Sequence, residues 1–247
     1  MFKVDTHLHL DLYKNQDTII NYINTEKSYT IAVTNLPDLY EQYAKDGRNS
    51  QYVRYALGFH PELACRYFHQ LSIFDRNLSS TRYVGEVGLD FTTKDVRDRI
   101  AQEQVFRHIL RACNRARGKI LTIHSRKAEK RVLELLKDVH SCQVILHWYT
   151  GPLSLIDVAI GRGYYFSINH QMINSIHGRK VIQNIPIEKI LIESDAPFTK
   201  GLRKNYCVSF MKDIYRYICY ERNMSEKNIE IRLKENFRRI LSGELSS

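Results

Sequence analysis

Short β-rich runs alternate with amphipathic helical patterns along the whole chain, and this alternation is the feature that most limits its fold. Strands that alternate with helices form parallel βαβ units, because a helix carries the chain back to the same edge of the sheet. The expected strands cover residues 2–7, 29–34, 54–58, 83–87, 120–124, 143–147, 164–168 and 190–193. Helical patterns cover 17–26, 96–117 and 127–139, and two closing helices are expected at 207–221 and 225–241.

The number of strands favours a closed barrel over an open sheet. Eight βα units fit within 247 residues, and barrels of this kind commonly form a single unit of about 250 residues. No G-x-G-x-x-G motif follows the first strand, which removes the main argument for a dinucleotide-binding fold. Length alone permits one domain or two, but no repeat, low-complexity stretch or linker interrupts the pattern. We therefore predict an α/β fold, a single (β/α)8 TIM-barrel domain over residues 1–247.

Composition and charge narrow the class of protein further. Hydrophobic residues make up 43% and charged residues 26%, close to the averages for soluble globular domains. No stretch approaches the roughly 20 apolar residues of a membrane span, and the start MFKVDTHLHL lacks a secretory signal, so we expect a cytoplasmic protein with no membrane partner. The five cysteines are scattered without a C-x-x-C pair, which argues against disulfide frameworks and thiolate zinc sites. The net charge of +10 suits a polyanionic partner or simply high solubility.

Metal-capable side chains collect at the carboxyl-terminal ends of the expected strands, where a barrel carries its chemistry. They are His7, His9, His60, Glu86, His124, His147 and Asp195. His7 and His9 are two residues apart, so both rings project from one face of a strand into the barrel mouth. Any one of these histidines is better explained as a hydrogen-bonded core or capping residue. Unrelated polar residues, however, would not repeatedly occupy the same end of a barrel.

The donor set predicts a pair of metal ions. Neutral nitrogen and anionic oxygen without thiolate suit two borderline or hard divalent cations, and we expect Mg²⁺, Mn²⁺ or Zn²⁺ with Glu86 as the bridge. Two such ions lower the pKa of a bridging water and hold both the attacking and the leaving oxygen of a phosphodiester. Asp195, on the last strand, would orient or deprotonate that water. A carboxylated-lysine bridge is not expected, because the fourth strand ends in Glu86 and Lys119 falls at the wrong end of the fifth.

At this point six motifs in their order along the chain resemble those of TatD-family metal-dependent deoxyribonucleases: DTHLHLD, GFHPE, GEVGLDF, IHSRKAE, HWYTG and ESDAPF. The resemblance implies a barrel of the metal-dependent hydrolase type. It implies one ion among His7, His9, Glu86 and Asp195, and a second among Glu86, His124 and His147. It also implies that His60 contacts the scissile phosphate or the leaving group. Glu193 stands in the E-S-D motif, where it takes part in catalysis or orients a ligand.

Three further residues are candidates for binding substrate. Arg126 could hold a phosphate with its guanidinium, or form a salt bridge at the barrel rim. Trp148 and Tyr149 stand where the family commonly has H-C-F-S-G, and they could stack on an unpaired base or pack beneath the loop. Arginines at positions 107, 111 and 115 form a helical stripe, which a barrel directs sideways, so a solvated face is favoured over a nucleic-acid track.

The resemblance implies hydrolysis of phosphodiester bonds in DNA, on single strands or 3′ ends and with 3′–5′ exonuclease polarity. The stretches VTNLP, GFHPE, HWYTGP and YYFSIN more narrowly resemble the QatD-type nuclease subunits of the bacterial Qat anti-phage system, which implies a defence role and operon-encoded protein partners. Two alternatives stay open. One is metal-dependent hydrolysis of an ester or amide, such as an aminoacyl-tRNA ester. The other is a nucleic-acid-binding subunit with residual activity, against which the complete ligand set argues.

Overall fold

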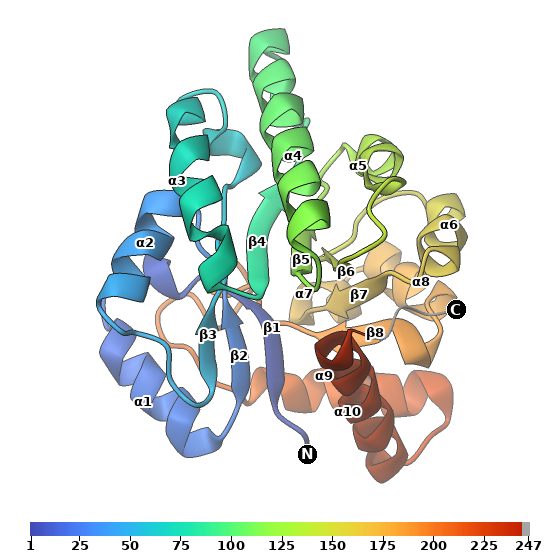
Figure 1. The fold of residues 1–247 in the computed structure, drawn as a ribbon. Coiled ribbons are helices and arrows are strands. Elements are labelled where there is room, and N and C mark those ends of the chain that lie inside the picture. The colour runs from blue at the N-terminus through green and yellow to red at the C-terminus, as the bar shows by residue number, and fades with distance from the viewer. Residues whose placement is uncertain (244–247) are drawn as a thin grey trace.

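Parallel strands and helices follow one another along the chain as the sequence predicts (Figure 1). The computed structural model describes residues 1–243. Its strands are β1 (Val4–Leu8), β2 (Tyr29–Ala32), β3 (Val53–Tyr55), β4 (Tyr83–Gly88), β5 (Ile120–His124), β6 (Gln143–His147), β7 (Tyr165–Ile168) and β8 (Ile190–Ile192). Every expected strand is present, so the predicted order of elements is confirmed.

Helices connect these strands and surround them (Figure 1). They are α1 (Gln16–Glu26), α2 (Pro37–Lys45), α3 (Leu71–Asn77), α4 (Val96–Ala116), α5 (Glu129–Leu136), α6 (Ile156–Gly161), α7 (His170–Asn174), α8 (Ile176–Asn184), α9 (Phe210–Arg222) and α10 (Glu226–Ser242). Short 3-10 turns lie at Leu10–Leu12, Pro61–Leu63, Phe68–Gln70, Leu78–Ser80, Leu153–Leu155 and Ile187–Lys189.

The helix expected at 127–139 is shorter in the structure. Lys127 has a φ of +56°, in the left-handed region that a right-handed α-helix cannot include. The preceding turn closes where the Ala128 amide donates to the Ser125 carbonyl at 2.9 Å. This turn delays the start of α5 to Glu129, a tertiary feature that helical periodicity does not report.

Two sheets of parallel strands close into one barrel. The strand order is β1-β2-β3 in one sheet and β4-β5-β6-β7-β8 in the other. The Gly85 amide donates to the Leu57 carbonyl at 3.0 Å, which joins the end of β3 to β4. The Asp195 amide donates to the His7 carbonyl at 2.9 Å, which joins the end of β8 to β1. The predicted (β/α)8 barrel is therefore confirmed.

An apolar layer fills the part of the barrel near the beginnings of the strands. Each strand, or the residue directly after it, contributes at least one buried side chain to a mutually packed cluster, which includes Val4, Ile31, Ala56, Tyr83, Ile120, Ile145, Tyr165 and Leu191. Only the interior of a closed barrel lets side chains from all its strands meet. Because side chains alternate along a strand, His147 lies on the same face as Ile145, and Glu193 on the same face as Leu191. The polar residues therefore follow the apolar layer toward the other end.

Helix α10 covers the end of the barrel at which the strands begin (Figure 1). The ring of Phe237 lies 5.2 Å from that of Tyr29 and 6.0 Å from that of Phe2. Asn236 is buried and donates hydrogen bonds to the Ile187 and Ile190 carbonyls at 2.7 and 2.8 Å. These contacts close the lower end, so side chains that follow the strands outward become accessible only at the opposite end.

Within residues 1–243, no helix combines the length and apolar character that crossing a membrane requires. The five cysteines are all unpaired; Cys113 and Cys142 are buried, whereas Cys65 is exposed.

The GFHPE segment begins with glycine, Gly58, because there is no room for a Cβ atom at this position. A Cβ at this position would lie 1.6 Å from the Thr34 carbonyl oxygen and 2.7 Å from that of Gly85. Both obstacles are backbone atoms, one just after β2 and one within β4, so Gly58→Ala is expected to destabilise the fold by about 2 kcal/mol or more, which urea unfolding measures. The matched control is Gly161→Ala in α6, where nothing lies within 4 Å of the added Cβ. Equal unfolding midpoints for both variants would contradict the prediction.

Candidate metal centre

The strand ends bring the predicted metal-capable residues together. His7, Glu86, His124 and His147 lie within β1, β4, β5 and β6, and His9, His60 and Asp195 lie shortly after β1, β3 and β8. Six of these residues, His7 excepted, line one cavity of ≈ 430 Å³. A second cavity of ≈ 400 Å³, between α1 and α2, contains no residue of this set.

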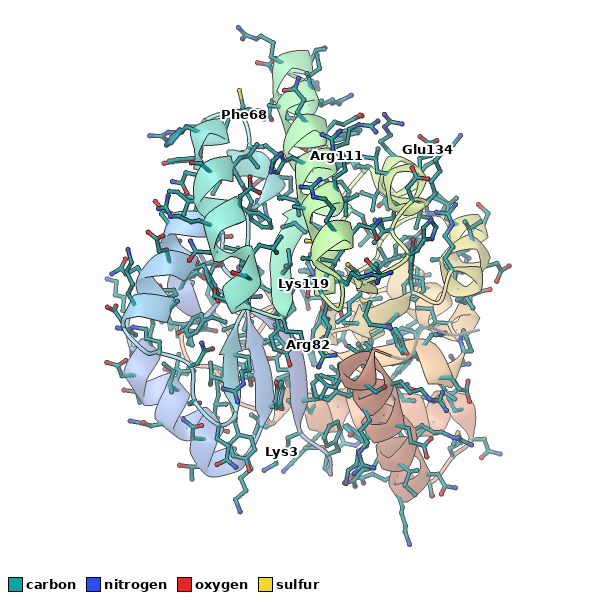
Figure 2. The ribbon with its side chains drawn as sticks, in the orientation of Figure 1. Lys3, Phe68, Arg82, Arg111, Lys119 and Glu134 are labelled. Atoms are coloured by element: carbon teal, nitrogen blue, oxygen red, sulfur yellow. The ribbon has the colours of Figure 1, made fainter. Side chains whose placement is uncertain are left out.

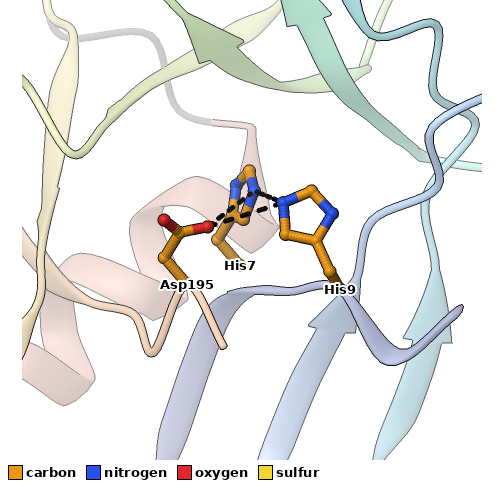
Figure 3. A group of neighbouring side chains, drawn as sticks. All are labelled: His7, His9 and Asp195. Carbon is orange, nitrogen blue, oxygen red and sulfur yellow. Dashed lines mark hydrogen bonds and ion pairs between the residues drawn. The ribbon is translucent and has the colours of Figure 1, made fainter. Parts of the chain in front are cut away.

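His7, His9 and Asp195 form the first cluster, which Figure 3 shows in close-up. The Nε2 atoms of the two histidines are 3.2 Å apart. Asp195 Oδ1 lies 3.7 Å from His7 Nε2 and 3.5 Å from His9 Nε2. Three ligand atoms from two neighbouring strand ends thus point at one common position.

Glu86 connects this cluster to a second group of histidines. Its Oε2 lies 3.5 Å from His7 Nε2 and 3.3 Å from His9 Nε2. Its Oε1 lies 2.7 Å from His147 Nε2 and 2.5 Å from His124 Nδ1. The two oxygens of one buried carboxylate therefore face two different sets of histidines, the arrangement expected of a bridging ligand.

Two residues of the site have positive φ angles, which residues other than glycine rarely adopt. Trp148 has a φ of +36° and Asp195 a φ of +45°. Hydrogen bonds hold both in place: the Trp148 amide donates to Glu193 Oε1 at 3.0 Å, and the Asp195 amide donates to the His7 carbonyl. Such conformations cost about 1–3 kcal/mol and cluster at functional sites, where they direct a side chain that regular strand geometry would not.

Glu193 lies beneath the metal-capable residues rather than in the cavity. It is completely buried and accepts hydrogen bonds from the Trp148 amide, the Asn169 side-chain amide and the Ser167 hydroxyl. Its Oε1 is also 3.8 Å from His147 Nδ1. These contacts suit the positioning role that the sequence left open for Glu193, because its oxygens are already engaged in holding the strand ends.

Asp90 is a residue of the site that the sequence analysis did not identify. Its Oδ2 lies 2.8 Å from His124 Nε2, while the other ring nitrogen of His124 faces Glu86. Its Oδ1 accepts a hydrogen bond from the Thr92 amide at 2.9 Å, which fixes the carboxylate. Burial opposes ionisation, but the hydrogen bonds from His124 and Thr92 outweigh it and lower the pKa of Asp90. The aspartate of the GEVGLDF motif was the available signal.

Burial and charge together set the protonation of the cluster. Burial disfavours the anion of Glu86, but the surrounding histidines outweigh it and hold the pKa of Glu86 well below its usual value. Burial also opposes protonation of His9, yet the neighbouring carboxylates of Asp195 and Glu86 outweigh it and raise the pKa of His9 to about 10. Protonated histidines compensate the negative charge of the buried carboxylates, and a bound divalent cation would compensate the same charge.

The residues fit divalent cations. Asp195 Oδ1 is buried and has no hydrogen-bond donor within residues 1–243, although it faces His7 and His9. The candidate ligand groups of the described chain contain histidine and carboxylate and no cysteine. This donor set suits the borderline and hard metals that the sequence predicts.

Lys119 lies far from this cluster, as expected. It directly precedes β5, and its ammonium donates to the Leu78 and Thr81 carbonyls at 2.6 and 2.5 Å. Figure 2 labels it near Arg82, which directly precedes β4. The Lys119 ammonium is thus engaged at the closed end of the barrel, away from the metal-capable cluster.

The candidate substrate residues separate into two groups. Arg126 is exposed and Trp148 is half-buried, and both line the cavity. Tyr149 is 1% exposed, and its hydroxyl donates to the Pro152 carbonyl at 2.8 Å. Of the two interpretations for the aromatic pair, the structure places Trp148 at the cavity and Tyr149 packed beneath the loop, because the backbone turn at Trp148 separates the two rings.

A parallel barrel that gathers histidines and carboxylates around one buried glutamate has the architecture of a metal-dependent hydrolase. Comparison with known proteins agrees, because residues 4–242 match the family described as TatD related DNase. The chain therefore belongs to the TatD family and is an enzyme of that family.

Relatives agree with this assignment, and a solved structure shares the fold. The human deoxyribonuclease TATDN3 is 26% identical over 214 residues, covering 78% of this chain and 77% of that protein. The metal-dependent hydrolase YabD of Bacillus subtilis is 26% identical over 263 residues, covering 96% and 97%. A further relative is matched over only 53% of its own length. The TatD homolog YJJV of Escherichia coli has a TM-score of 0.85 at 20% identity, covering 97% and 98% of the two chains, which shows the shared fold.

Asp90 provides a test of how the histidines are held. Asp90→Asn replaces the acceptor that fixes the His124 ring, and we expect metal affinity to fall about 10- to 100-fold, as for other residues that orient a metal ligand. Calorimetric titration with Mn²⁺ measures the change. Asp138→Asn is the control, because Asp138 is exposed and lies outside the cavity. Equal affinities in both variants would show that Asp90 does not position His124.

Proposed function

We propose that this chain is a two-metal-dependent deoxyribonuclease that hydrolyses phosphodiester bonds, acting on single strands as a 3′–5′ exonuclease. The observation that carries the proposal is the position of the Glu86 carboxylate, whose two oxygens face separate sets of histidines. Membership of the TatD related DNase family and the net charge of +10 support DNA as the substrate.

The proposed ligand sets follow the two sides of Glu86. His7, His9, Glu86 and Asp195 would hold one ion, and Glu86, His124 and His147 would hold the other, with Mg²⁺, Mn²⁺ or Zn²⁺ as the metal. When bound, the ions supply Lewis-acid activation of water and of the phosphoryl group. The remaining work falls to side chains that hold the substrate and move protons.

Asp195 is proposed to orient and deprotonate the attacking water. Its Oδ1 faces His7 and His9, whereas its second oxygen is directed away from the two rings (Figure 3). A carboxylate with one oxygen beside the candidate ligands and the other turned away from them can accept a proton from a molecule held in the cavity.

His60 is proposed to donate a hydrogen bond to the scissile phosphate or the leaving group. Its Nδ1 accepts from the Glu62 amide at 3.3 Å, so in the neutral ring Nε2 carries the proton. Nε2 is 3.5 Å from Glu86 Oε2, at the edge of the cluster. Burial, together with the positive charge of nearby histidines, outweighs the attraction of Glu86 and lowers the pKa of His60 to about 4. A neutral ring at pH 7 contributes a hydrogen bond rather than a charge.

The biological setting is proposed from the narrower sequence resemblance alone. It supports an anti-phage role in the bacterial cytoplasm, with proteins of the same defence operon as partners. Residues 1–247 would act there as a single hydrolase domain, since the family match extends over nearly the whole chain.

The test is cleavage of 5′-end-labelled single-stranded DNA with Mg²⁺ or Mn²⁺. Wild type is expected to shorten the strand stepwise from its 3′ end, and EDTA or Glu86→Ala to abolish shortening, because the bridging carboxylate is lost. Glu188→Ala is the matched control, an exposed glutamate before β8 that is expected to retain full activity.

Other outcomes of this assay point to specific alternatives. A chelated enzyme with full activity would refute the metal dependence. Release of an aminoacyl ester without cleavage of DNA would make the chain an esterase. Tight binding of DNA by metal-loaded protein, without turnover of either substrate, would make it a binding subunit.

Arg126 is proposed to bind a substrate phosphate. It lines the cavity, is exposed, and forms no ion pair with any residue in the described range 1–243. Arg126→Ala is expected to raise KM for DNA about 10-fold or more, because a charge-assisted hydrogen bond is lost, and Arg126→Lys to restore part of it. Steady-state kinetics measure the effect. Arg115→Ala, on the outer part of α4, is the control; an equal rise in KM there would favour the α4 stripe as the DNA track instead.

A further inference from the structure

Phe198 is an exposed aromatic residue beside the metal-capable cluster. It is 60% exposed, whereas the residues around it in the chain are largely covered; Asp195 and Thr199 are 3% and 1% exposed. Its ring lines the same cavity as His60 and Arg126. An isolated exposed apolar side chain is ordinary, but one that lines a cavity beside candidate metal ligands requires a reason.

The turn that carries Phe198 is held firmly. The Phe198 amide donates to the Asp195 carbonyl at 2.9 Å, and the Thr199 hydroxyl donates to the Ser194 carbonyl at 2.8 Å. The Phe198 ring also meets the His9 ring edge to face, with centroids 5.1 Å apart and planes at 88°. One part of the ring therefore contacts a candidate ligand, while its exposed part stays available to a molecule in the cavity.

The rest of the cavity matches the parts of a nucleotide. Arg126 offers a guanidinium to a phosphate, and Trp148 offers a second aromatic surface. A volume of ≈ 430 Å³ falls within the usual range of small-molecule sites. Aromatic surfaces beside a cation are the combination by which proteins hold single-stranded nucleic acid, because every unpaired base exposes a flat face.

We propose that Phe198 determines substrate specificity by stacking on an unpaired nucleobase at the end of the DNA strand. This inference rests on the proposed nuclease function and deepens it. A terminal base in a duplex is held by its pairing partner and by the one neighbour on which it stacks, so it must leave the duplex before it can enter the cavity and stack on a ring fixed beside the cluster. Phe198 thereby makes the enzyme select frayed or single-stranded ends over paired ends.

A structural role for Phe198 predicts different behaviour. If the ring served only to hold His9, its removal would weaken metal binding and would affect all substrates alike. If it stacks on a base, its removal leaves metal affinity unchanged and affects only substrates that carry a base at the contacted position. The two roles are therefore separated by the metal titration and by the chemistry of the substrate.

The experiment compares Phe198→Ala and Phe198→Trp with wild type on single-stranded DNA with a normal or an abasic 3′-terminal nucleotide. Loss of one base–aromatic stack corresponds to about a 5- to 150-fold change. Phe198→Ala is expected to raise KM on the normal strand by this factor, and Phe198→Trp to restore it. On the abasic strand, wild type and Phe198→Ala are expected to be alike. Tyr220→Ala, 86% exposed on α9 and outside the cavity, is the control.

Equilibrium binding of the same strands, followed by fluorescence anisotropy, separates this inference from the proposed function. Failure of wild type to hydrolyse DNA would refute the nuclease, but a weaker affinity of Phe198→Ala for the normal strand alone would still support base stacking. Unchanged affinity and KM in Phe198→Ala would overturn the inference, whether or not DNA is cut. An equal loss on normal and abasic strands, or a loss of Mn²⁺ affinity, would also overturn it.

Discussion

The buried carboxylate of Glu86 is the group on which the rest of the site depends. Burying a carboxylate is costly unless compensating charge lies beside it, and histidines from β1, β5 and β6 supply that compensation at its two oxygens. Protons and cations compete for the same ring nitrogens, so the protonation of the cluster and its affinity for metal are linked. The arrangement of the site therefore follows from the need to compensate a buried negative charge inside the barrel, which the surrounding histidines meet.

The barrel meets this requirement through its two-residue repeat. Ile145 packs in the apolar layer and His147, two residues later, faces Glu86; Leu191 packs in the same layer and Glu193 follows it. The register of the strands thus determines both which side chains pack in the apolar layer and which face the metal-capable cluster. Helix α10 closes the end of the barrel at which the strands begin. The apolar residues of each strand are therefore buried near that end, and the polar residues lie near the end at which the strands finish.

Patterns local in the sequence predicted the strands and the metal-capable residues, since hydrophobic alternation and strand ends are read from neighbouring positions. The sequence did not reveal Asp90, whose importance comes from a contact with His124, a partner on another strand. It also treated Trp148 and Tyr149 as a pair, although the left-handed backbone at Trp148 sends the two rings to different surroundings. Both differences arise where tertiary contacts or loop dihedrals determine what a side chain reaches.

Positive charge and substrate selection reside in different parts of the molecule. On the outer surface, Glu103 pairs with both Arg107 and Arg131, which reduces the net charge of the α4 region. At the cavity, Arg126 forms no ion pair with the described residues 1–243. The overall charge can attract a polyanion from a distance, but only groups at the cavity distinguish one strand end from another. Strand hydrogen bonds fix the candidate ligands, whereas loops carry the groups that meet substrate. Loop changes can therefore alter which substrate enters while the metal-capable cluster stays in place.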